Sequence, residues 1–159
     1  SMVNQDPQPE IYTTRHEFTN TNTTGDVSTV TVYTNQANNE ELRIYAILVD
    51  ILNENGTPAS TATTDVDFGV TIQVGPNNIP TNEFDATVIC FRDDKQLAFP
   101  TPILALFQQP LGVQVSLNST TGATLAANRT VVISLVGELA IQKRIPPTNL
   151  AFRGPSYKR

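Results

Sequence analysis

The side chains of this chain that could do chemistry are mainly carboxylates arranged in pairs. Three pairs lie within two positions of each other: Asp65 and Asp67, Glu83 and Asp85, and Asp93 and Asp94. Two carboxylates on one face of a strand could catalyse glycoside hydrolysis or bind calcium through oxygen ligands. Calcium sites usually draw three or more acidic ligands, and glycosidases use aromatic platforms, whereas this chain has no Trp. We therefore interpret the pairs as solvated strand faces, ahead of a calcium site and of a hydrolytic site.

Histidine and cysteine each occur once, as His16 and Cys90. A histidine-based metal site or a Cys–His nucleophile pair would have to rest on these single residues. We interpret His16 as an ordinary surface or edge residue, and Cys90, in the apolar run 87–91, as a small buried hydrophobe. The sequence contains neither a Gly-x-Ser-x-Gly elbow nor a glycine-rich phosphate loop. It predicts no catalytic residue, no metal ligand and no cofactor, and therefore a protein that is not an enzyme.

The elements that carry these side chains are predicted to be β-strands, because apolar and polar residues alternate along much of the chain. Strands are expected at 11–18, 27–34, 42–52, 65–74, 84–91, 113–117 and 130–137, with Gly, Pro and Asn turns between them. The segment 42–52 is apolar almost throughout, which favours a central strand buried on both faces. This spacing predicts an all-β fold, an antiparallel two-sheet β-sandwich of jelly-roll or immunoglobulin-like type.

The predicted strands form one domain, residues 11–142, with a different kind of segment on each side. Residues 1–10 hold two prolines and few apolar side chains, which is typical of a flexible lead-in, and Ser1-Met2 has the form of a tag remnant. Residues 143–159 are expected to form an extended basic C-terminal arm, since the pair Pro146-Pro147 opposes a helix. No apolar run reaches the roughly 18–20 residues that a membrane helix needs.

Charge divides the chain into an acidic body and a basic arm. Residues 1–140 carry 15 acidic and 5 basic groups, a balance of −10, whereas residues 141–159 carry 5 basic groups and no acid, a balance of +5. The acidic body argues against nucleic acid as a partner, and the basic arm is expected to bind an acidic surface such as a neighbouring copy.

The arm combines cations with apolar anchors. The residues expected to bind a partner are Lys143, Arg144, Ile145, Leu150, Phe152, Arg153 and Tyr157. We expect this arm to dock on a neighbour by filling pockets and adding a strand. A disordered tail or an inter-domain linker is the alternative.

Three segments share a recognisable order of strands and turns. They read Phe99-Pro-Thr-Pro-Ile103, then Pro110-Leu-Gly-Val-Gln-Val-Ser-Leu-Asn-Ser119, then Thr130-Val-Val-Ile-Ser-Leu-Val-Gly137. This order resembles the β-sandwich virion proteins of tailed bacteriophages, such as head-decoration, spike or connector-associated proteins. The resemblance implies a structural, non-enzymatic role in a homo-oligomer, with termini that reach neighbouring shell subunits.

These observations together predict a structural component of a phage-like virus particle, located in the virion. It is expected to assemble with copies of itself, a trimer being the first expectation, and with other virion proteins. Neither nucleic acid nor a membrane is expected as a partner. The alternative is a carbohydrate- or receptor-binding module of a secreted or surface protein. Glycan platforms usually use exposed Trp or Tyr, and the four tyrosines here are scattered in sequence: Tyr12, Tyr33, Tyr45 and Tyr157.

Overall fold

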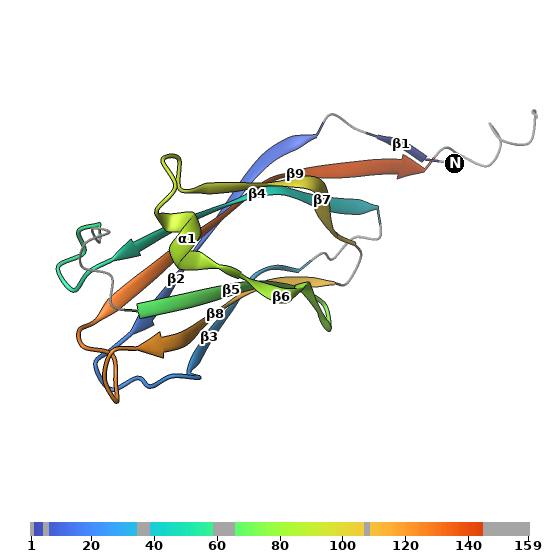
Figure 1. The fold of residues 1–159 in the computed structure, drawn as a ribbon. Coiled ribbons are helices and arrows are strands. Elements are labelled where there is room, and N and C mark those ends of the chain that lie inside the picture. The colour runs from blue at the N-terminus through green and yellow to red at the C-terminus, as the bar shows by residue number, and fades with distance from the viewer. Residues whose placement is uncertain (1, 5–6, 35–38, 59–65, 107–108, 145–159) are drawn as a thin grey trace, which may run out of the picture.

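Two antiparallel β-sheets pack face to face in the computed structural model, which describes residues 2–4, 7–34, 39–58, 66–106 and 109–144 (Figure 1). Within these ranges there are nine strands and one short helix. The all-β, two-sheet β-sandwich predicted from the sequence is confirmed. No helix in the described ranges has the length and apolar character needed to cross a membrane.

The first sheet is organised around the two longest strands. β9 (Arg129–Arg144) pairs along one edge with β4 (Glu40–Leu52), and β4 pairs in turn with β7 (Gln96–Ala105). Along its other edge β9 pairs with β2 (Gln8–Phe18) and, further on, with β1 (Met2–Asn4).

The second sheet has the order β3-β8-β5-β6. These strands span Val27–Thr34 (β3), Pro110–Thr120 (β8), Val66–Val74 (β5) and Asn77–Asp85 (β6). With the exception of the hairpin between β5 and β6, each strand from β3 to β9 lies in the opposite sheet from the strand before it. The immunoglobulin arrangement differs, because its consecutive strands D and E lie in one sheet and its strands F and G lie in the other.

The core lies between the sheets and is built from the alternating residues that the sequence indicated. On β5, Val66, Phe68, Val70, Ile72 and Val74 are all buried. The rings of Phe18 and Phe68 lie 5.2 Å apart and join the two sheets near one end. Burial of this apolar area is the main stabilising contribution to the sandwich.

The central strand β4 differs from its prediction in how its two faces are buried. It was predicted to be buried on both faces, but its residues alternate between buried and partly exposed, and Tyr45 is 39% exposed. A β-bulge between Ile44 and Ala46 changes which residues face the core, so that Leu42 and Ile44 are followed by Ile47, Val49 and Ile51. The continuous apolar run of this strand therefore reflects a shift in alternation rather than two buried faces.

The predicted strand at 84–91 is also wrong. β6 ends at Asp85, and residues Ala86–Cys90 form helix α1. The Asp85 side chain caps this helix by accepting a hydrogen bond of 3.1 Å from the backbone N–H of Val88. Ala86, Ile89 and Cys90 face the core, so their apolar pattern arises from one turn of helix. Cys90 is fully buried, as expected of a small hydrophobe.

His16 was predicted to be a surface or edge residue. It lies on β2, an edge strand of the first sheet, but its side chain is fully buried and not at the surface. Its Nε2 lies 2.7 Å from the hydroxyl of Thr14, and its Nδ1 lies 3.1 Å from the Ser28 hydroxyl and 3.2 Å from the Ser28 carbonyl. These contacts join β2 to β3, so the imidazole bridges the two sheets. Burial lowers the pKa of His16 below its ordinary value.

The strands reach further toward both termini than the sequence indicated. β1 and the start of β2 fall within residues 1–10, the range expected to be a flexible lead-in. β9 continues through Lys143 and Arg144, which were assigned to the arm. β1 pairs with the last residues of β9, so backbone hydrogen bonding extends the sheet beyond the predicted domain boundary at residue 142.

Candidate functional site

The predicted partner-binding arm is described by the structure only at its beginning. Lys143 and Arg144 are the last residues of β9 and pair through their backbones with Val3 and Met2. The other predicted arm residues lie outside the described ranges: Ile145, Leu150, Phe152, Arg153 and Tyr157. β4 stops pairing with β9 at Ile141, so the final residues of β9 pair with β1 as a two-stranded extension at one end of the sandwich (Figure 1).

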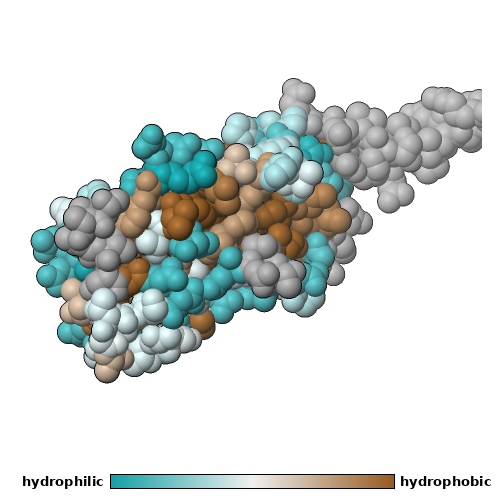
Figure 2. Space-filling view, viewed as in Figure 1, coloured by the Kyte–Doolittle hydropathy of each residue, from teal (hydrophilic) through white to brown (hydrophobic). Residues whose placement is uncertain are grey.

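One lateral side of the sandwich carries exposed apolar side chains. Here the edge strand of each sheet, β6 and β7, lies beside helix α1, and Figure 2 shows an apolar area in the middle of this side, surrounded by polar surface. Val88 on α1 is 61% exposed. We call this side, with its residues Phe84, Val88, Leu97 and Phe99, the β6–β7 side.

An aromatic pair holds the two sheets together on the β6–β7 side. The rings of Phe84 on β6 and Phe99 on β7 are stacked, with centroids 5.6 Å apart and an interplanar angle of 26°. Both rings pack against the core and remain half-buried, so each keeps part of its surface accessible. Stacked aromatic rings of this kind provide much apolar contact area to a partner.

Three of the carboxylates singled out in the sequence meet on the outer face of the second sheet, next to the same edge strand. Asp67, Glu83 and Asp85 line a shallow hollow of about 190 Å³ together with Asn118. Glu83 accepts hydrogen bonds from the Ser116 hydroxyl, at 2.6 Å, and from the Asn118 amide. Its carboxylate lies directly over Gly69, where any larger residue would displace it.

These three carboxylates influence one another. Burial, and then the neighbouring charges of Asp85 and Glu83, raise the pKa of Asp67 above its ordinary value. No group of three His, Cys, Asp or Glu side chains suited to a metal ion occurs in the described ranges. The cluster is therefore a locally negative surface beside an apolar one. Asp65, which was paired with Asp67 in the sequence, lies outside those ranges.

The opposite lateral side joins β2 and β3 through a second aromatic pair that the sequence did not reveal. Tyr12 and Tyr33 lie with ring centroids 5.6 Å apart and are tilted by 40°. The Tyr12 hydroxyl donates to Glu10, and the Tyr33 hydroxyl donates to Glu40. Burial and the adjacent carboxylate of Glu10 raise the pKa of Tyr12. The contact could not be read from the sequence, because the two residues are 21 positions apart on different sheets.

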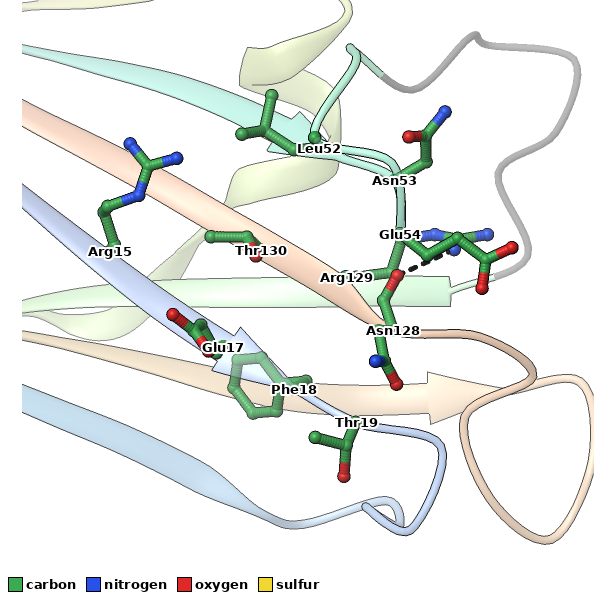
Figure 3. Close-up of a pocket in the computed structure, with 11 residues that line it drawn as sticks. Arg15, Glu17, Phe18, Thr19, Leu52, Asn53, Glu54, Asn128, Arg129 and Thr130 are labelled. Atoms are coloured by element: carbon green, nitrogen blue, oxygen red, sulfur yellow. Dashed lines mark hydrogen bonds between the residues drawn. The ribbon is translucent and has the colours of Figure 1, made fainter.

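A pocket of about 260 Å³ lies where β2 and β4 end and β9 begins (Figure 3). Its lining mixes charges of both signs, including Arg15 and Glu17 from β2 and Glu54 after β4. The Arg129 guanidinium donates to the Asn128 carbonyl at 3.0 Å. Phe18, the aromatic residue among those that line the pocket, is 2% exposed. The pocket thus offers charged and polar groups to a ligand but no accessible ring face.

Comparison with known proteins found no matching family model and no similar curated protein. Among solved structures, the chain is similar to the acidic stable capsid of Helicobacter pylori bacteriophage KHP30, with a TM-score of 0.43, 11% identity, and coverage of 91% of this chain and 100% of that one. It is also similar to turnip yellow mosaic virus (TM-score 0.31, 11% identity, 89% and 97% covered) and to the delta-endotoxin Cry8Ea1 of Bacillus thuringiensis (0.27, 11%, 88% and 20%). We take no conclusion about this chain's function from likenesses at these TM-scores.

Proposed function

We propose that this chain is a non-enzymatic structural subunit of a virus particle, phage-like in kind, that assembles with copies of itself in the virion. Its C-terminal arm, including Phe152 and Arg153, contacts the neighbouring subunit. A closed homo-oligomer is the expected form, with a trimer as the first expectation. Neither nucleic acid nor a membrane is proposed as a partner, because the body of the chain is acidic.

The observation that carries this proposal is the strand order. One sheet has β2-β9-β4-β7 and the other has β3-β8-β5-β6, and successive strands pass from sheet to sheet except at the hairpin between β5 and β6. An eight-stranded sandwich connected in this way by two Greek keys is a jelly roll, an architecture found in viral capsid and lectin domains and in cupins. Of these, cupins and lectins need a ligand site, whereas a capsid subunit needs surfaces that bind other subunits.

The ends of the chain support an assembling subunit. β1 and the end of β9 pair with each other, so both terminal segments leave the sandwich at the same end. Fifteen residues follow Arg144, and an extended chain of that length can span about 50 Å. That reach exceeds what is needed to cross onto an adjacent domain of this size.

The experiment measures the mass of the full chain in solution by light scattering at low and high salt. We expect a multiple of the 17.3 kDa chain mass, three chains being the first expectation, and a smaller mass for a chain that ends at Arg144. Ending there keeps all of β9 and its pairing with β1. A full-length variant with residues 145–159 in reversed order is the matched control, since it has the same composition. A full chain that stays monomeric at every concentration and salt would contradict the proposal.

The second candidate is a carbohydrate- or receptor-binding module, and one observation favours it. Tyr12 and Tyr33 form an accessible ring pair beside the carboxylates of Glu10 and Glu40, which is the kind of surface on which a sugar ring can stack. A glycan array of the full chain tests it, with Tyr12→Ala as the variant and Tyr45→Ala as the control. Binding that the Tyr12 substitution removes and the Tyr45 substitution preserves would favour this candidate over a virion subunit.

A further inference from the structure

We infer that the C-terminal arm of one copy binds to the free edge of β6 on a neighbouring copy. Residues 148–153 add there as a further strand, with Phe152 beside the Phe84–Phe99 pair and Arg153 beside the carboxylates of Glu83 and Asp85. This inference rests on the proposed function, because it identifies the surface that receives the arm.

The first element of the inference is the open edge. β6 pairs with β5 along one side and ends the sheet on the other. An edge strand presents backbone N–H and C=O groups that an extended segment can pair with. β7, the edge of the other sheet on this side, contains Pro100 and Pro102, which both lack the N–H that a ladder needs. β6 contains one proline, Pro80, and it precedes the residues Glu83–Asp85 beside which the end of the arm is placed.

The second element is the alternation of side chains along β6. Phe84 points inward and stacks on Phe99, whereas its neighbours Glu83 and Asp85 are exposed on the outer face of the sheet. A strand added beside β6 has the same two faces, so its alternate residues lie next to the aromatic pair and next to the carboxylates. Such a strand therefore needs apolar residues at the alternate positions that lie next to the aromatic pair, and a cation at one of the positions in between, next to the carboxylates.

The arm meets that requirement. In an extended strand, Leu150 and Phe152 lie on one face, and Ala151 and Arg153 lie on the other. The six residues 148–153 are free of proline and lie between Pro146-Pro147 and Gly154-Pro155, which limits a strand to a typical length. Phe152 and Leu150 therefore face the aromatic pair when Arg153 faces the acidic side.

The third element is charge. Asp67, Glu83 and Asp85 gather at this edge, and none of the ion pairs found in the described ranges involves them. A guanidinium placed among them would relieve their mutual repulsion and could form bidentate hydrogen bonds with a carboxylate. The other edges fit less well: β3 carries no charged residue, and β2 carries Arg15 among its acids.

The test is photo-cross-linking of the full-length chain. Phe152 is replaced by p-benzoylphenylalanine, and the protein is mixed with unmodified chain labelled with ¹⁵N before irradiation. Mass spectrometry of the cross-linked peptides then shows which copy and which strand the arm contacts. We expect mixed-isotope links to β6 or β7, in the ranges 77–85 and 96–105. The same analogue at position 45, on the outer face of the first sheet, is the control and should not produce these links.

A second variant tests the contribution of charge. Arg153→Gln should raise the concentration at which half of the chains are assembled on the order of tenfold at low salt, and much less at high salt. Asp67→Asn combined with Glu83→Gln should produce the same rise, and adding Arg153→Gln to that pair should raise it little further. Arg15→Gln, on the exposed face of β2, is the matched control and should leave assembly unchanged.

The outcomes separate this inference from the proposed function. Assembly that depends on the arm, with cross-links to another strand of the neighbour or only within the same chain, would overturn the β6 edge and leave the structural role standing. Normal assembly of Arg153→Gln would overturn the pairing of Arg153 with the carboxylates. A chain that does not assemble at all would overturn both.

Discussion

Two glycines, one in each sheet of this sandwich, are expected to respond differently to replacement by alanine. Gly137 on β9 pairs with Ile44 at the bulge of β4, and a Cβ at this position would collide with the backbone carbonyl of Arg43. Gly69 on β5 lies beneath the Glu83 side chain, and a Cβ there would collide with the end of that carboxylate. The obstacle is backbone in the first case and a movable side chain in the second.

The magnitudes follow from these contacts. In Gly137→Ala, the β4 bulge must move within a closely packed sheet, at a cost of about 1–3 kcal/mol, with about 1 kcal/mol more for a weakened backbone hydrogen bond. Replacing Gly by Ala in a strand also stabilises the folded state by about 0.5–1 kcal/mol, because Ala loses less backbone entropy on folding. The net expected loss is about 2 kcal/mol.

In Gly69→Ala the Glu83 carboxylate can rotate into solvent, because it is exposed. Its hydrogen bonds to Ser116 and Asn118 are lost, at about 0.5 kcal/mol each for exposed groups, and the same entropy gain offsets this. The stability of this variant should therefore lie within about 0.5 kcal/mol of that of the natural chain.

Urea unfolding followed by circular dichroism separates the two variants. With a slope of about 2 kcal/mol per M, Gly137→Ala should lower the midpoint by about 1 M, and Gly69→Ala should leave it nearly unchanged. Equal midpoints for the two variants, or a larger loss in Gly69→Ala, would refute the distinction between backbone and side-chain obstacles. Gly69→Ala is also useful for the arm, since it should displace Glu83 and weaken assembly without unfolding the chain.

Two further predictions concern single polar contacts. Burial favours the neutral form of His16, so its pKa is lowered in the folded state; the stability it supports is present above pH 6.5 and is lost as pH falls below that value. His16→Asn should reduce the loss of stability between pH 7 and 5.5, measured by urea midpoints, and an identical loss in both proteins would contradict this reasoning. Asp85→Ala should cost about 1 kcal/mol by removing the cap of α1, whereas Asp93→Ala, in the exposed turn after the helix, should cost much less in the same assay. Equal losses from the two aspartates would show that the cap is not the cause.

Local pattern sufficed for the strands whose two faces differ in solvent exposure. β3 was predicted with its observed bounds, and the five apolar residues of β5 from Val66 to Val74 are in the core as expected. Alternation with a period of two residues indicates directly which side chains face a core, so this prediction does not require knowledge of the partner strand. It failed at Ala86–Cys90, where five residues are too few to distinguish one helical turn from a strand.

The sequence by itself determined a β-sandwich, a chain without a recognisable catalytic motif, and an acidic body that precedes a basic arm. The tertiary structure decided what depends on distant residues. Pairing across the sheets buries His16, joins Tyr12 to Tyr33, and brings Phe84 to Phe99 beside three carboxylates. The physical reason is that strand order and register bring together residues far apart in the chain, and local alternation contains no information about which strands become neighbours.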